Sequence, residues 1–385
     1  MPQTAYQMPP SSGHQTYRGK LGQLRMQRLS SRMYAKIGQN WLMRTPEVFQ
    51  FVFYPRYIEE VRSAKEVDLY NLPANNDLMQ TGHTLHKDLE WDQYHFNVVS
   101  KQLTQSLGPG LPAIVDECFG AFHDLIGEPK GMFSDIMSFS IVPRTANRLL
   151  FGVDLAKNRD FLKLAIDCSD TFFAGANMIR HYAEWTKRLA LDTSTLCYEL
   201  ALRRWRRQRE TRHMNRQNPV ILYGGFSTER LMLRLIHILT AAVHTSSVTY
   251  LNALYDLAMH PDIHDELREE IKNVFASQNG EWRKQGLTKM MKLDSFIKES
   301  ARFHPFQAGT MDRVAMKDYT LSDGTLVPKG TYMLTPSSAA NFDTEVRDPN
   351  ALDFDPWRFQ KRRLEKGQET AFHGSNYATI HLLRV

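Results

Sequence analysis

The sequence has no long apolar run. None of its 385 residues falls in a stretch of about 18 or more consecutive apolar side chains, the length that a membrane-spanning helix requires. Cysteine is also scarce, because the chain contains only Cys118, Cys168 and Cys197, with neither CxxC nor Cys/His spacing. A disulfide framework and a zinc site therefore receive no support, and a reducing compartment fits best.

The amino-terminal residues lack the apolar segment of a secretory signal peptide. Residues 1–33 instead carry basic side chains among Ser, Gln and Pro, which predicts a polar, basic and disordered leader. The whole chain contains 48 Lys and Arg against 42 Asp and Glu, giving a net charge of +6 and a pI near 9.1. This modest excess is compatible with an anionic partner or an anionic membrane surface.

Helical periodicity dominates the rest of the sequence. Residues 227–259 contain neither Pro nor Gly, carry apolar residues at helical spacing, and end where His260 precedes Pro261. At 1.5 Å per residue this helix spans on the order of 50 Å, and its apolar middle predicts burial. Residues 48–64 predict a short strand that turns at Pro55 into a helix, and Asp323-Gly324 predicts a hairpin. We expect a mainly α protein with a small β portion, an α+β fold.

A block of polar side chains, AAVHTSS at residues 241–247, interrupts this apolar helix. Hydroxyl groups there can bond to carbonyls one turn earlier, which loosens the helix and creates a polar notch in a dry environment. The simpler interpretation is that these hydroxyls are satisfied by their own helix and that His244 finds one partner.

Two further motifs pair opposite charges. Glu299 and Arg302 lie three residues apart on one helical face, a common arrangement that alone contributes only about 0.2–0.5 kcal/mol. In FDPWRF, residues 354–359, Pro356 and Trp357 fix a packed segment around Arg358, whose guanidinium can reach Glu299 bidentately. The motifs are specific in order and spacing, with 54 residues from Thr245 to Glu299 and 56 from Arg302 to Arg358.

The most basic tract, Arg203 to Gln217, allows a different function. An Arg cluster can bind phosphate, so a nucleic-acid-binding protein is one hypothesis. A solvated helix end is the simpler interpretation, because the tract is single and has neither interleaved aromatic residues nor a nucleic-acid fold motif beside it. Anionic lipid headgroups and an acidic redox partner are further alternatives.

The motifs together resemble those of the cytochrome P450 family over residues 34–377. AAVHTSS is similar to the family's oxygen-binding helix, ESAR to its Glu-x-x-Arg motif and FDPWRF to its Pro-x-Arg-Phe segment, and DRVAMKDYTLSDGTLVPKG between them is similar as well. QLTQSLG, ANRLLFG and LYDLAMHPDIHDELREEI resemble filamentous-fungal members of the ent-kaurene oxidase and secondary-metabolite type. The fold that this resemblance implies is the mainly helical cytochrome P450 fold.

The resemblance also implies roles for individual residues near haem. Thr245 would help deliver protons to the dioxygen that haem activates, with His244 beside it in a position where many members have an acid. Ala241 and Ala242 match the small residues that let the helix lie against haem, and Arg313 matches a strand arginine that pairs with a haem propionate.

Glu299, Arg302 and Arg358 match the family's structural triad, which braces the loop that carries the iron ligand. The next family motif, Phe-x-x-Gly-x-x-x-Cys-x-Gly, is expected after SNYATI, where this sequence reads HLLRV. The three cysteines all precede the oxygen-binding helix and lack the flanking Gly and Phe, so no metal ligand is assigned. We divide the chain into the leader 1–33, an incomplete cytochrome P450-like domain 34–377 and a tail 378–385.

The activity that the resemblance implies is insertion of one oxygen atom of O2 into an apolar, polycyclic secondary metabolite, terpenoid or alkaloid-like, within a biosynthetic pathway. Haem is the implied cofactor, an NADPH-dependent reductase the implied electron donor, and no nucleic acid is involved. The expected location is the cytoplasm or the surface of the endoplasmic reticulum, with peripheral membrane contact and no transmembrane anchor. The alternative is a truncated, catalytically inactive member that lacks the haem-ligating cysteine and retains a ligand pocket or an interaction surface, and for the 385-residue sequence as it stands we expect this inactive form rather than activity.

Overall fold

The computed structural model describes residues 40–44, 49–92, 94–126, 133–180, 182, 184–187, 228–307, 309–345, 349–365 and 367. The expected leader, the expected tail, the basic tract Arg203 to Gln217 and Cys197 lie outside these ranges. Within them, no helix combines the length and the apolarity needed to cross a bilayer.

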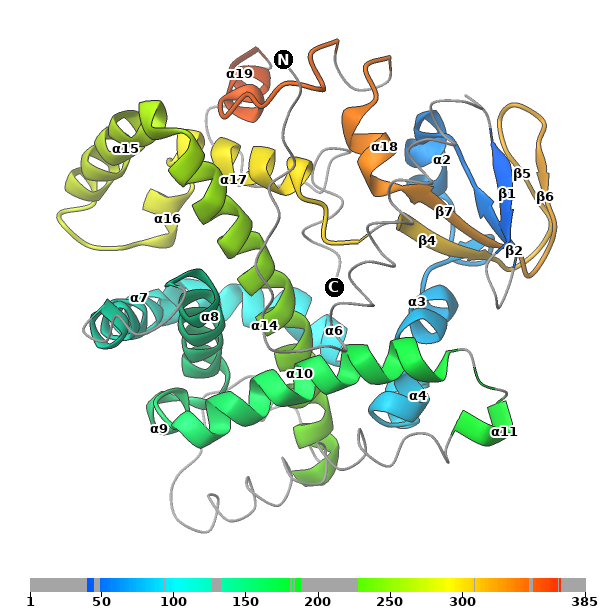
Figure 1. Ribbon diagram of the computed structural model, residues 1–385, viewed down its shortest axis with the longest axis horizontal. Coiled ribbons are helices and arrows are strands. Elements are labelled where there is room, and N and C mark those ends of the chain that lie inside the picture. The colour runs from blue at the N-terminus through cyan, green and yellow to red at the C-terminus, as the bar shows by residue number, and fades with distance from the viewer. Residues whose placement is uncertain are drawn as a thin grey trace.

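Helices form most of the described chain (Figure 1). The long ones are α7 (Thr104–Ile126), α8 (Phe133–Phe151), α10 (Arg159–Ile179), α14 (Thr228–Met259), α15 (His264–Ser277) and α17 (Met291–Phe303). The shorter ones are α2 (Ile58–Ser63), α3 (Leu72–Met79), α4 (Thr81–Thr84), α5 (Asp88–Trp91), α6 (Tyr94–Val98), α9 (Val153–Ala156), α11 (Glu184–Lys187), α16 (Lys284–Leu287), α18 (Ser337–Phe342) and α19 (Arg358–Glu365). Single turns are η1 (Pro55–Tyr57), η2 (Val99–Leu103) and η3 (Pro261–Ile263).

A five-stranded sheet and a two-stranded hairpin lie together at one side of the molecule (Figure 1). The strands are β1 (Trp41–Arg44), β2 (Phe49–Val52), β3 (Leu69–Tyr70), β4 (Gly309–Ala315), β5 (Tyr319–Thr320), β6 (Leu326–Val327) and β7 (Tyr332–Pro336). The sheet order is β1-β2-β7-β4-β3, with β2 and β7 parallel and the other pairs antiparallel. The sheet therefore joins strands from the first third of the chain to strands from its last third.

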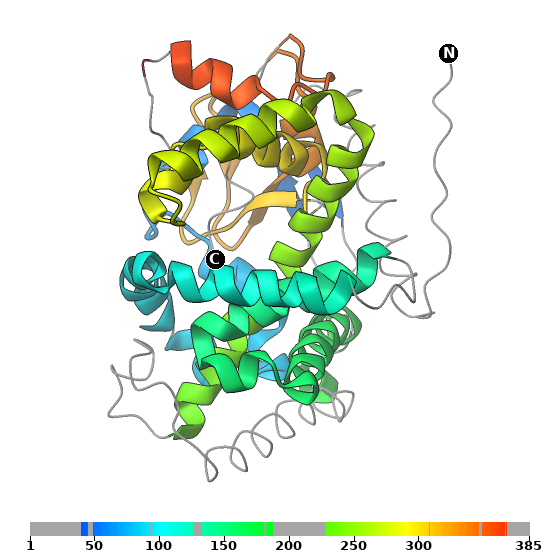
Figure 2. The ribbon, with the colours of Figure 1, turned by 90° about the vertical axis from the view of Figure 1, so that its left-hand side faces the viewer.

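The expected elements are present. The strand that turns at Pro55 is β2 followed by η1 and α2, and the predicted hairpin is β5–β6, where Gly324 takes the left-handed φ of +87° that favours glycine. The expected helix over residues 227–259 is α14, which runs through the molecule from the end that carries α15 to the far side of α10 (Figures 1 and 2). The mainly α fold with a small β portion is confirmed.

The apolar face of α14 is the centre of the helical core. Leu235, Leu239 and Val243 on this helix are buried against Leu150 of α8 and Phe161 of α10. Their spacing of four residues places them on one side of the helix, as the sequence predicts. A second core lies between the sheet and α2. The site described below lies where α14 crosses α10.

Candidate functional site

The polar block of α14 bonds to its own helix. The Thr245 hydroxyl donates to the Ala241 carbonyl at 2.7 Å, and the Thr249 hydroxyl donates to the Thr245 carbonyl at 2.9 Å. The helix is nevertheless continuous from Thr228 to Met259, so the expected loosening has not interrupted it. The simpler interpretation of the block is thus confirmed for the Thr245 hydroxyl. Each hydroxyl oxygen still has lone pairs with which to accept a proton.

The residues of this block differ in burial. Ala241 and Ala242 are half-buried, as is Thr245, whereas Ser247 is fully buried. The imidazole of His244 is 27% exposed, and its Nδ1 atom lies 3.9 Å from Oδ1 of Asp170 on α10. The predicted residues of α14 therefore lie together on a helix whose neighbouring turns are packed in the core.

Both arginines that the sequence pairs with Glu299 bind its carboxylate on α17. Arg302 binds the carboxylate with two parallel hydrogen bonds, Nε to Oε2 at 2.9 Å and Nη2 to Oε1 at 2.8 Å. Nε of Arg358 lies 3.2 Å from each carboxylate oxygen, and the Asp355 amide donates to Oε1 at 2.9 Å. The three charged side chains are at most 4% exposed. Such a group is stable only when every charge is paired and hydrogen-bonded, as it is here.

The same guanidinium groups hold the loop that precedes α19. Arg302 Nη1 donates to the carbonyls of Asn341 and Ala351 at 2.9 and 2.6 Å. Nη2 of Arg358 donates to the carbonyls of Asn350 and Asp353, both at 2.8 Å. Carbonyl oxygens with no strand or helix partner are thereby satisfied. Removal of either arginine would free this loop from α17.

Arg313 lies on β4, at a distance in sequence from the triad. Thr310 pairs with Thr335 and Arg313 with Met333, so β4 contains one residue more than β7 in this stretch, which is a β-bulge. Met311 within it has a φ of +60°, a strained value for a residue with a side chain. Bulges redirect side chains, and the buried Arg313 guanidinium donates from Nη1 to the Asp312 carbonyl at 2.8 Å.

The two described cysteines lie in packed environments. Cys168 is 8% exposed within the core formed by α8, α10 and α14. Cys118 on α7 packs beside Ala121 and Ile141, and burial raises the pKa of its thiol. A raised pKa disfavours the thiolate, the form that binds metal. Among the described residues, no group of three or more His, Cys, Asp or Glu side chains gathers as a metal site would require.

A polar cluster at the amino-terminal half of α14 was missed at the sequence level. Arg234 is fully buried, and its Nη2 donates to Oδ2 of Asp92 at 2.7 Å while its guanidinium lies 4.6 Å from the Tyr94 ring centroid. His237, one turn later, contacts the buried His95. The signal was available in the sequence, because Arg234 and His237 are three residues apart in an otherwise apolar helix and so share one face.

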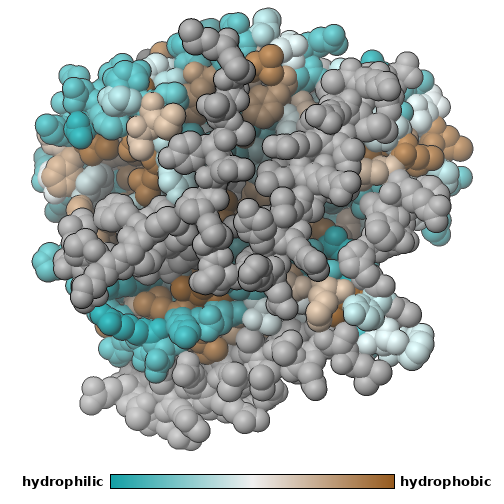
Figure 3. Space-filling view, viewed as in Figure 1, coloured by the Kyte–Doolittle hydropathy of each residue, from teal (hydrophilic) through white to brown (hydrophobic). Residues whose placement is uncertain are grey.

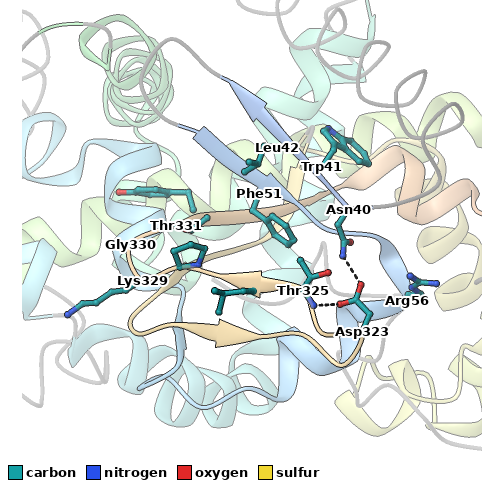
Figure 4. A pocket seen from close by; sticks show the side chains of 13 residues that line it. Asn40, Trp41, Leu42, Phe51, Arg56, Asp323, Thr325, Lys329, Gly330 and Thr331 are labelled. Atoms are coloured by element: carbon teal, nitrogen blue, oxygen red, sulfur yellow. Dashed lines mark hydrogen bonds between the residues drawn. The ribbon is translucent and has the colours of Figure 1, made fainter.

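A cavity of about 1060 Å³ lies away from α14, between β1, β2 and the β5–β6 hairpin (Figure 4). Asp323 at its edge accepts hydrogen bonds from Asn40 at 3.3 Å and from Tyr57 at 2.7 Å. Leu42 and Leu326 on its rim are 64% and 57% exposed, and apolar side chains gather at this edge of the surface (Figure 3). None of the predicted site residues lines the cavity, so we do not assign the site to it.

The sequence of this chain is similar to that of known proteins. The family model described as Cytochrome P450 matches residues 200–374, which include α14, the triad and Arg313. A cytochrome P450 monooxygenase of Emericella nidulans is 30% identical over 355 residues, 85% of this chain and 66% of that protein. A cytochrome P450 monooxygenase of Postia placenta is 28% identical over 341 residues, 82% of this chain and 68% of that protein. The chain thus spans about two thirds of the length of the curated relatives it matches.

The fold is similar to that of solved structures as well. A zebra fish cytochrome P450 structure with abiraterone superposes with a TM-score of 0.64 at 18% sequence identity. The superposition covers 86% of this chain and 82% of the zebra fish chain. At this level of sequence identity, the similarity shows only that the two proteins share a fold.

Proposed function

The chain belongs to the cytochrome P450 family, and we propose that it acts as a haem-dependent monooxygenase. The substrate is an apolar, polycyclic secondary metabolite, terpenoid or alkaloid-like, made in a fungal biosynthetic pathway. It receives one oxygen atom of O2, and the electrons come from NADPH through a reductase. Nucleic acid takes no part. The protein works in the cytoplasm or at the surface of the endoplasmic reticulum, in peripheral contact with the membrane.

One observation carries the proposal: the fully buried Glu299 carboxylate is shared by Arg302 and Arg358, whose other N–H groups hold the loop before α19. The triad takes no part in the chemistry itself. It fixes the backbone that leads toward the expected ligand segment, and ligand placement to a fraction of an ångström is what a metal centre needs from its surroundings.

The described residues fit the surroundings of haem but include no ligand for its iron. Ala241 and Ala242 give α14 a flat, small-residue face, and the bulge in β4 presents the Arg313 guanidinium, a cation suited to a propionate. Cys118 and Cys168 do not fit the ligand position, because both are packed in apolar helical clusters and neither has the flanking Phe and Gly of the family's ligand motif. The ligand must come from residues other than those described.

The protein's own part in the reaction is to place the reactants and to move protons. Haem supplies the activation of dioxygen when it is bound. The Thr245 oxygen accepts a proton at its free lone pair and passes its own hydroxyl proton toward the site, while His244 supplies protons from the side of α10. The buried turns of α14 on either side exclude bulk water from this route.

Oxygen-18 incorporation tests the proposal. A C-terminally extended form of the protein that carries the family's Phe-x-x-Gly-x-x-x-Cys-x-Gly loop is supplied with haem, NADPH, a fungal reductase and a panel of apolar polycyclic compounds under ¹⁸O2. We expect a product that gains a single oxygen-18 atom, and none when NADPH is omitted. Binding of these compounds without any labelled product would contradict the proposal and favour a non-catalytic, ligand-binding protein. Retention on DNA that weakens with salt would favour the nucleic-acid hypothesis.

A further inference from the structure

The cavity between β1, β2 and the β5–β6 hairpin is lined largely by apolar side chains. Its volume is about 1060 Å³, which is that of a large small-molecule site, since such sites occupy roughly 300–1,000 Å³. Phe51 is buried, and Figure 4 shows its ring directed from β2 toward the hairpin. Leu42 and Leu326 beside it are mostly exposed. Apolar surface of this kind is stabilised by a ligand that removes it from water.

Arg56 at one end of this cavity is held by two aromatic rings. Its guanidinium carbon lies 5.4 Å from the ring centroid of Tyr54 and 4.8 Å from that of Tyr57. Among the residues that the structure describes, no carboxylate forms an ion pair with it. A planar guanidinium that packs on rings keeps N–H groups at its edge, where they can bind a carboxylate with two parallel hydrogen bonds. Arg56 is therefore a positioned cation that can accept an anionic ligand.

The acid at the same end of the cavity already has three donors. Oδ2 of Asp323 accepts hydrogen bonds from Tyr57 at 2.7 Å and from Asn40 at 3.3 Å. Oδ1 accepts from the Thr325 amide at 2.9 Å. The hydrogen bond from Tyr57 is the main cause that lowers the pKa of this carboxyl, followed by Thr325, and the charge of Arg56 contributes as well. Asp323 is therefore an anion that fixes the wall of the cavity, and its charge favours a ligand with a single negative group.

A second cation lines the cavity but extends away from it. The Lys329 side chain points away from the other lining side chains, on the opposite side of Phe51 from Arg56 (Figure 4). Its backbone amide donates to Oδ1 of Asp318 at 2.8 Å. An ammonium group in solvent contributes little to binding, because water and salt screen its charge. Arg56 is therefore the expected anchor for an anion, and Lys329 is its matched control.

We propose that this cavity binds an amphiphile with one carboxylate and an extended apolar chain, a class of ligand separate from the polycyclic substrate of the proposed function. The carboxylate pairs with the Arg56 guanidinium, and the chain covers Phe51 and the exposed side chains of Leu42 and Leu326. Apolar groups supply most of the contact and a single charged group fixes the orientation, as is usual in small-molecule sites. The inference goes beyond the proposed function, because no residue assigned to haem or to proton delivery lines this cavity.

Calorimetric titration of the 385-residue chain with decanoate, kept monomeric, tests the proposal. We expect saturable binding of decanoate and about tenfold weaker binding of decanol, which has the same chain without the charge. Arg56→Gln should weaken decanoate binding by about tenfold, because a charge-assisted hydrogen bond is lost, and should leave decanol binding unchanged. Lys329→Gln should leave the affinity for both ligands within a few-fold of the wild type. Both side chains are exposed, so neither change removes a core contact.

Two leucine variants test the apolar part of the site. Leu326→Asp places a charge against the expected path of the chain and should weaken the binding of both ligands by at least about tenfold. Leu352→Asp changes a leucine that is 67% exposed and does not line the cavity, so it should leave both affinities unchanged.

Equal decanoate affinities in the wild type and in Arg56→Gln would overturn the proposal, as would the absence of saturable binding. Binding to phosphatidylserine vesicles without any binding of monomeric decanoate would also overturn it, in favour of a membrane surface as the partner. The titration contains neither haem nor NADPH, so its failure is distinct from failure of the proposed function.

Discussion

Nε2 of His95 on α6 lies 3.0 Å from Nδ1 of His237 on α14, which joins segments 142 residues apart. His95 is fully buried. Burial, followed by the positive charge of His237 and Arg234, lowers the pKa of His95 to about 3. Burial and the charge of Arg234 lower the pKa of His237 to about 4. Both imidazoles are therefore neutral in the folded protein at neutral pH, and one donates the hydrogen bond that the other accepts.

This pair makes stability depend on pH. The unfolded chain takes up protons on both histidines as the pH falls through 6.5, whereas the folded protein does so only near 4 and 3. Stability is thus fully present above about pH 6.5 and is lost as the pH falls toward 4 and 3, by up to about 1.4 kcal/mol per pH unit for each histidine. Urea unfolding at about pH 7, 5.5 and 4.5 measures this slope.

Two variants test whether this pair, rather than other histidines, causes the pH dependence of stability. We expect His95→Gln to flatten the slope, because one buried group no longer titrates. His86→Gln, which changes a 45% exposed histidine, should leave the slope as it is in the wild type. Equal slopes in all three proteins would show that the buried pair does not govern the acid sensitivity.

Loss of the triad carboxylate should lower the free energy of unfolding far more than loss of an exposed carboxylate. Glu299→Gln leaves the buried guanidinium groups of Arg302 and Arg358 without a counter-charge, and we expect a loss of about 3–5 kcal/mol in the free energy of unfolding. Glu266→Gln breaks an exposed pair with Lys292 and should cost at most about 1 kcal/mol. Denaturant titration compares them, and similar losses would contradict the bracing role of Glu299.

Thr245 and Thr249 allow a paired test of proton delivery. Both hydroxyls bond to a carbonyl four residues earlier on α14, so Thr245→Ala and Thr249→Ala remove the same kind of helix contact. We expect Thr245→Ala to lower product formed per NADPH consumed by about 10²-fold, the size of a lost proton-transfer group. Thr249→Ala should stay within a few-fold of the wild type. Equal effects of the two changes would show that both hydroxyls only stabilise the helix.

Arg313 should matter for cofactor retention. We expect Arg313→Gln to weaken haem binding by about 10- to 10²-fold, because a charge-assisted hydrogen bond to a carboxylate contributes about 1.5–3 kcal/mol. Arg283→Gln removes an exposed arginine paired with Glu281 and serves as the control. Haem bound per chain is measured after gel filtration. Unaltered retention in Arg313→Gln would remove Arg313 from the cofactor-binding residues.

The sequence predicted the fold where its signals are local. The periodicity of α14, the Pro55 turn and the Gly324 hairpin each depend on a few neighbouring residues, and each is found in the structure. The pairing of Glu299 with Arg302 and Arg358 was predictable as well, because the motifs carry the partners and their order.

Other contacts depend on chain crossings that no short motif encodes. Asp170 meets His244 only because α10 crosses α14, and His95 meets His237 across 142 residues. The bulge that aims Arg313 arises from the register between β4 and β7, and the one-residue offset shows only when both strands are paired. For these features, the sequence shows that polar residues lie in apolar surroundings, but it does not show which residues they contact.

The most direct measurement of the central claim is the absorption spectrum of a haem-reconstituted, C-terminally extended form of the protein that carries the family's Phe-x-x-Gly-x-x-x-Cys-x-Gly loop, reduced under carbon monoxide. The account predicts the red-shifted Soret band of thiolate-ligated haem in this form, and its decay on Glu299→Gln as the loop before α19 loses its anchor. A spectrum of histidine-ligated or unbound haem in the extended form would contradict the account.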